Sequence, residues 1–80
     1  MVKWEPIKSE MYAVLLSRVL EIYSIGSDEA LHSITFDSTQ TSFDFVSSTS
    51  LVVCDDKGRL TLFTSIDSTE NISMKIIETD

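Results

Sequence analysis

The stretch LVVCDDKGRLTLF, residues 51–63, decides the fold class. Its first four residues are apolar and its last four alternate around Thr61, as in buried or half-buried β-strands. Residues 55–58 read as a tight turn, because Gly58 adopts positive φ without steric cost. We therefore predict two adjacent antiparallel strands joined by a hairpin. The positions that we expect inside the packed layer are Leu51, Val53, Leu60 and Leu62.

The first half of the chain has the same rhythm. Residues 20–23 read LEIY and residues 60–63 read LTLF, so the two segments lie about 40 residues apart. A period near 40 residues with four strands in each unit is typical of β-propeller blades. The strand-like segments are Trp4, 12–16, 19–23, 31–36, 43–46, 51–54, 59–63 and 72–77. We predict an all-β chain of about two four-stranded antiparallel propeller-type blades. The expected units are 1–38 and 39–80, within a single domain or propeller fragment spanning 1–80.

Residues 10–24 also fit a helix. Ser9 is a suitable N-cap and Gly26 a suitable stop. The apolar residues near one helical face are Met11, Leu15, Val19 and Ile22. In this alternative the fold is a small α+β domain, with an N-terminal helix on an antiparallel meander. The internal repeat favours strands.

Composition and charge limit the possible functions. The chain has 80 residues and a net charge of −7, and its six cations are scattered along the sequence. An acidic chain without a basic cluster repels a phosphate backbone, so we expect no direct nucleic-acid binding. No apolar run approaches the roughly 20 residues of a membrane span, and the first residues lack the layout of a signal peptide. A single cysteine, Cys54, excludes an internal disulfide framework and indicates the cytoplasm or the nucleus.

No group of residues predicts catalysis or metal binding. His32 is the only histidine, and with Cys54 it cannot supply the usual ligands of a metal site. Cys54 has no base or cation beside it in the sequence, so we expect it to pack as a small apolar residue. Asp55 and Asp56 stand in a hairpin too short for a calcium loop, and turn capping is their expected role. We therefore predict neither an enzyme nor a cofactor.

Residues 51–63 resemble the middle of a WD repeat, with an apolar second strand, an acidic hairpin containing glycine and an alternating third strand. Residues 12–23 are similar, with a shorter hairpin. Together with Val2-Lys3-Trp4, they resemble a middle blade of the kinase-interacting WD-repeat proteins that assist large ribosomal subunit assembly. The departures are Tyr23-Ser24 and Phe63-Thr64, where WD repeats usually have Trp-Asp, and the lack of the usual Gly-His pair.

The resemblance implies a non-enzymatic protein-interaction scaffold. Two blades leave unpaired edges and faces, so we expect packing against further blades or self-association. The predicted loops at 5–10, 37–40 and 67–71 are acidic on balance, which favours a protein partner with a basic surface. Trp4 is expected to anchor the core or to form a binding hot spot. The α+β alternative implies a small regulatory or dimerisation module. The residues that we expect to contact a partner are Trp4, Glu5, Glu10, Asp37, Asp67 and Glu70.

Overall fold

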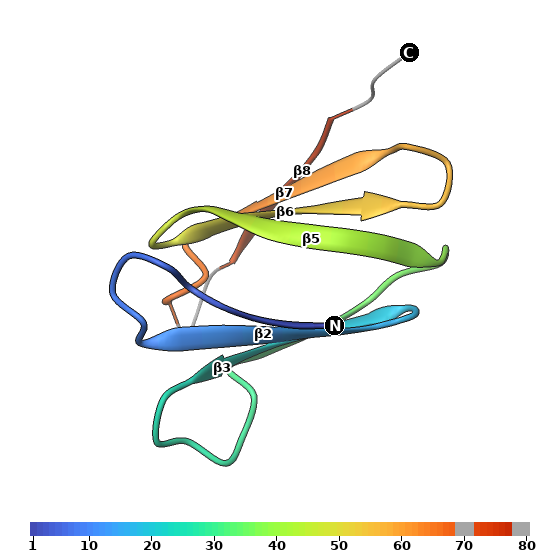
Figure 1. The fold of residues 1–80 in the computed structure, drawn as a ribbon. Helices are drawn as coiled ribbons and strands as arrows, with labels where there is room; N and C mark the ends of the chain where they lie inside the picture. The colour runs from blue at the N-terminus through green and yellow to red at the C-terminus, as the bar shows by residue number, and fades with distance from the viewer. Residues whose placement is uncertain (69–71, 78–80) are drawn as a thin grey trace.

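The chain forms two four-stranded antiparallel sheets, which lie one above the other (Figure 1). The computed structural model describes residues 1–68 and 72–77, and no helix occurs within them. The first sheet contains β1 (Val2–Trp4), β2 (Met11–Leu16), β3 (Val19–Ser24) and β4 (His32–Thr35). The second sheet contains β5 (Gln40–Ser47), β6 (Ser50–Asp55), β7 (Leu60–Thr64) and β8 (Ser73–Ile77). In each sheet the strand order follows the chain order. The predicted all-β fold with two four-stranded units is confirmed.

The helical alternative for residues 10–24 is wrong. These residues contain the whole of β2 and β3, with Leu15 opposite Leu20 and Ala13 opposite Ile22. Alternate residues of both strands are buried, which is the period of a strand. The helical pattern arose because Met11 and Leu15 are four residues apart, a spacing that fits a helical turn and also two strand repeats.

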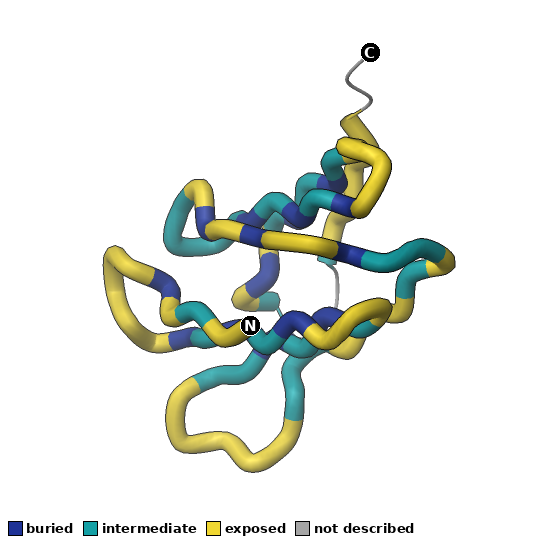
Figure 2. Tube along the Cα trace, turned by 45° about the vertical axis from the view of Figure 1, so that its right-hand side comes forward, coloured by how far each residue is buried: buried dark blue, intermediate teal, exposed yellow. Residues whose placement is uncertain are grey.

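The two sheets share one apolar core. We call the faces that meet there the inner faces and the opposite faces the outer faces. β2 packs against β5, and the rings of Phe36 and Phe63 meet edge to face with centroids 6.1 Å apart. Along most strands, buried residues alternate with exposed or half-buried ones (Figure 2). The buried apolar residues are Met11, Ala13, Leu15, Leu20, Ile22, Phe43, Phe45, Leu51, Val53, Phe63 and Ile66.

The side chains of β7 that face the core are not the predicted ones. Leu51 and Val53 are buried as expected, but Leu60 and Leu62 are only half-buried and lie on the outer face. Their neighbours face the core instead, because Thr61 pairs with Val53 and Phe63 pairs with Leu51. Directly opposite residues in antiparallel strands share one face of the sheet. Because Leu51 and Val53 of β6 are buried, the β7 residues opposite them, Phe63 and Thr61, are buried too.

The predicted hairpin at residues 55–58 is present. Gly58 has φ +83°, the left-handed conformation that glycine adopts without strain. The Asp55 carboxylate accepts hydrogen bonds from the backbone N–H groups of Lys57 at 2.9 Å and Arg59 at 2.8 Å. The hydrogen bond from the Arg59 N–H is the largest cause of a lowered pKa at Asp55, and the other donors and the Arg59 charge lower it further. Together they outweigh burial, which raises the pKa. Asp55 is thus the turn-capping residue that the sequence predicts.

The connection between the sheets is held by the hairpins on either side. The N–H groups of Phe36 and Gln40 donate to the carbonyls of Arg18 and Ser17, each at 2.7 Å. The Ser38 hydroxyl donates to the Asp55 carboxylate at 3.4 Å. Residues 36–40 therefore bind both the β2–β3 and the β6–β7 hairpins, which fixes one sheet relative to the other.

Candidate functional site

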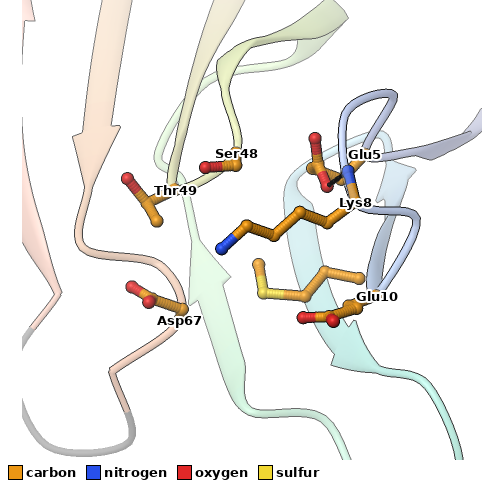
Figure 3. Close-up of a pocket in the computed structure, with 7 residues that line it drawn as sticks. Glu5, Lys8, Glu10, Ser48, Thr49 and Asp67 are labelled. Carbon is orange, nitrogen blue, oxygen red and sulfur yellow. Dashed lines mark hydrogen bonds between the residues drawn. The ribbon is translucent and has the colours of Figure 1, made fainter.

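Three of the predicted partner-binding residues meet at one end of the molecule. Glu5, Glu10 and Asp67 line a small hollow together with Lys8 and the turn at residues 48–49. The Lys8 side chain extends across this hollow toward the turn and Asp67 (Figure 3). The hollow thus combines acidic side chains from the β1–β2 and β7–β8 connections with one lysine.

Glu5 is not the exposed rim residue that the sequence suggested. It is 1% exposed, and its carboxylate accepts hydrogen bonds from the N–H groups of Ile7, Lys8 and Ser9. Burial raises the pKa of Glu5, but the three hydrogen bonds and the Lys8 charge outweigh it, so the pKa lies below its ordinary value. Ser9 has φ 55° in the same loop. Glu5 therefore orders the β1–β2 loop rather than meeting a partner.

The hollow does not have the properties of a substrate or metal site. Its volume is about 40 Å³, room for a few water molecules, whereas organic ligands occupy pockets of about 300 Å³ or more. Within residues 1–68 and 72–77, no three His, Cys, Asp or Glu side chains are placed to hold a metal ion. Glu10 and Asp67 are exposed acidic side chains at this end of the sheets.

The other predicted residues lie elsewhere. Asp37 is exposed in the connection at the opposite end, beside Ser38 and the β6–β7 hairpin. Trp4 is 53% exposed on the outer face of the first sheet, so it does not anchor the shared core. Glu70 lies outside the described residues. The structure therefore does not gather the predicted residues into one surface.

The outer face of the first sheet carries an aromatic row. Trp4 pairs with Tyr12 and Tyr12 with Tyr23, with ring centroids 5.0 and 5.1 Å apart. Glu21 lies on the same face, opposite Val14. Burial is the largest cause of a raised pKa at Tyr23, and the Glu21 carboxylate adds to it. The aliphatic residues of this face are Val2, Val14, Leu16 and Val19. Val2 and Leu16 are 59% and 53% exposed, so the face is an apolar surface open to solvent.

The outer face of the second sheet is aliphatic. Paired positions across the sheet place Asp44, Val52, Leu62 and Lys75 in one row. The neighbouring row is Ser42, Cys54, Leu60 and Ile77. The Cys54 thiol is half-buried and donates to the Asp55 carbonyl at 3.5 Å. This face is therefore apolar at its centre, with single charges in its outer strands.

Sequence reasoning missed these two faces, although a signal was present. An antiparallel sheet with one buried face alternates apolar and polar residues. In MYAVLL and LVVC, residues 11–16 and 51–54, the positions of both faces are apolar. Continuous apolar strands indicate that both faces of a sheet are covered by protein.

His32 lies in a strand, β4, as predicted. It is half-buried, and its Nε2 atom has no hydrogen-bond partner among the residues that the structure describes. In the same residues no helix is long and apolar enough to cross a bilayer.

No protein-family model, no characterised protein and no solved structure matches the chain.

Proposed function

We propose that this chain is a non-enzymatic protein-interaction module whose two outer sheet faces bind protein. The observation that carries the proposal is the apolar character of both outer faces, one with the Trp4–Tyr12–Tyr23 row and one with Val52, Cys54, Leu60 and Leu62. Contiguous apolar surface open to solvent marks interaction sites in soluble proteins. Exposed tryptophan and tyrosine are also enriched among residues that dominate binding energy.

The module corresponds to a pair of blades in a WD-type propeller. Each unit is a four-stranded meander, and the two sheets stack face to face. Such a sheet is stable between two neighbours, so each outer face needs a further sheet from another segment, a copy of this chain or a partner. The resemblance to kinase-interacting WD-repeat proteins supports large ribosomal subunit assembly, in the nucleus or the cytoplasm, as the process.

Charge favours a partner with a basic surface. The chain has a net charge of −7, and exposed carboxylates stand in the loops at both ends of the sheets, among them Glu10, Asp37 and Asp67. Opposite charges speed association by long-range attraction, which salt screens. The association rate with such a partner should therefore fall as ionic strength rises, and bare DNA or RNA should not bind at physiological salt.

Site-specific photo-crosslinking tests the proposal. A photoreactive amino acid replaces Val14 on one outer face, Val52 on the other, or Lys57 at an exposed hairpin tip as the control. Irradiation in cells should join the two face positions to protein far more efficiently than the Lys57 position. Equal yields at all three positions, or no adduct from either face, would overturn the proposal.

A further inference from the structure

The two sheets have matching rows of side chains. In each sheet, three residues on the first three strands are paired directly opposite one another and form a row across these strands. In the first sheet the row is Trp4, Tyr12 and Tyr23; in the second it is Phe45, Leu51 and Phe63. The first and third positions are aromatic in both rows. The row of the second sheet is buried in the shared core, whereas the row of the first sheet lies on an outer face.

The opposite faces match as well. Leu15 pairs with Leu20, and Ala13 with Ile22, on the inner face of the first sheet. Their counterparts on the outer face of the second sheet are the pairs Cys54 with Leu60 and Val52 with Leu62. All four counterparts are apolar. The outer face of the second sheet thus has the character of the face that already packs on a neighbouring sheet within the chain.

We propose that copies of this chain associate head to tail, with the outer face of the second sheet on the outer face of the first sheet of the next copy. The proposal rests on the proposed function, since it names the occupant of the two protein-binding faces. The outer face of the second sheet matches the inner face of the first sheet, and the outer face of the first sheet matches the inner face of the second. The two inner faces already pack against each other inside the chain. The contact between copies therefore repeats the packing that the chain already makes between its own sheets.

The packing inside the chain indicates which strands meet. Inside the chain, β2 of the first sheet packs against β5 of the second. The strand equivalent to β2 is β6, and the strand equivalent to β5 is β1. Between copies, β6 should therefore lie against β1 of the next copy. This arrangement sets Val52 and Cys54 close to Val2 and Trp4 of the neighbour. Both pairs of side chains are on outer faces in a single copy.

Charge favours the same arrangement. Phe36, at the end of β4, meets Phe63 on β7, so the counterpart of β4, β8, should approach β3 of the next copy. β8 carries Lys75 on its outer face. The loop after β3 carries Asp28 and Glu29, both exposed. Within the described residues, none of these three side chains forms an ion pair in the single copy.

The contact joins two different faces, so each copy keeps one free face after binding. Contacts of this heterologous kind build rings when the rotation between copies closes and filaments when it does not. In both cases the association continues beyond a dimer. A contact between two identical faces would stop at the dimer.

Thiol cross-linking tests the proposal directly. Cys54 already marks the outer face of the second sheet, and Val2→Cys adds a thiol to the outer face of the first. The full chain with both thiols is treated with a short bismaleimide. The controls are the parent chain, with Cys54 alone, and Val2→Cys/Cys54→Ser, with residue 2 alone. Val2 is an exposed edge-strand residue, so the variant should melt as the parent does.

Head-to-tail association predicts a ladder of dimers, trimers and larger species from the two-thiol chain. Each single-thiol protein should form no cross-linked species, and a mixture of the two should give cross-linked dimers. Added Lys75→Glu should weaken the ladder, whereas Lys57→Glu, an equal charge change at an exposed hairpin, should not. Efficient dimers from one single-thiol protein alone, or no ladder, would overturn the proposal. If photo-crosslinks from Val14 and Val52 then reach a different protein, the interaction module stands and only self-association fails.

Discussion

The two sheets have the same topology but bury their aromatic rows differently. Phe63 in the second sheet is 1% exposed, because the first sheet covers it. Its counterpart Tyr23 lies on an outer face with Trp4, which is 53% exposed. The residue type and the position in the sheet are alike. The difference therefore comes from the neighbouring sheet, which is present on one side and absent on the other.

Replacing the matched aromatic residues tests this comparison most strongly. Phe63→Ala should lower the free energy of unfolding by about 3–5 kcal/mol, because it removes a buried ring that contacts Phe36 and leaves a cavity. Such a loss is enough to unfold a domain of this size. Tyr23→Ala in the isolated chain should have a much smaller effect. Urea denaturation followed by circular dichroism measures both, and equal losses would show that the two rows are equally covered.

The β2–β3 hairpin and its counterpart in the second sheet, the β6–β7 hairpin, also differ. The β2–β3 turn consists of Ser17 and Arg18, whereas the longer β6–β7 turn depends on the Asp55 carboxylate. Asp55→Ala should lower the melting temperature clearly, because two backbone N–H groups and the Ser38 hydroxyl lose their acceptor. Asp56→Ala removes the exposed neighbouring carboxylate and should change the melting temperature little. Similar melting temperatures for the two variants would contradict the capping role.

A smaller effect is expected at the glycine of the same hairpin. Gly58→Val should cost about 1 kcal/mol or more, because a β-branched residue resists the positive φ found there. No atom lies within 4 Å of an added Cβ, so the cost is conformational rather than steric crowding. Lys57→Val is the matched control. Coincident urea curves for the two variants would show that the turn does not require positive φ.

Among the residues that the structure describes, two buried carboxylates have a lowered pKa, Glu5 in the β1–β2 loop and Asp55 at the end of β6. In the unfolded chain these groups bind protons at their ordinary pKa values, 4.5 and 3.8, and in the folded chain only at lower pH. Their contribution to stability is therefore complete above these values and is lost as the pH falls through the folded pKa values. Urea midpoints between pH 6 and pH 2 measure this loss. Glu5→Gln/Asp55→Asn should flatten the curve, and an unchanged slope would contradict the shifts.

The sequence predicts the strands and their order well. Turn residues such as Gly58 interrupt apolar segments whose side chains alternate with period two, and the offset of 40 residues shows the repeat. Local patterns of this kind depend on neighbouring residues alone. The eight strands therefore fall close to the predicted segments.

The site was harder to predict because it depends on which sheet covers which face. From the sequence, the buried face of β7 could carry either Leu60 and Leu62 or Thr61 and Phe63. Only the pairing with β6 shows that it carries Thr61 and Phe63. Glu5 reads as a loop carboxylate, and only the fold shows that three N–H groups surround it. Trp4 fits a core or a surface equally well. Its exposure follows from the absence of a sheet on that side.

The last strand has a consequence for the dynamics of the molecule. Every residue of β8 is exposed, including Met74 and Ile76 on the inner face, and among the described residues the strand pairs only with β7. Segments with few buried apolar contacts open with a small free energy, well below that of global unfolding. Amide hydrogens of β8 should therefore exchange with solvent earlier than those of β6, at the centre of the sheet. Each opening event exposes the edge of β7 and provides a template on which another strand can pair.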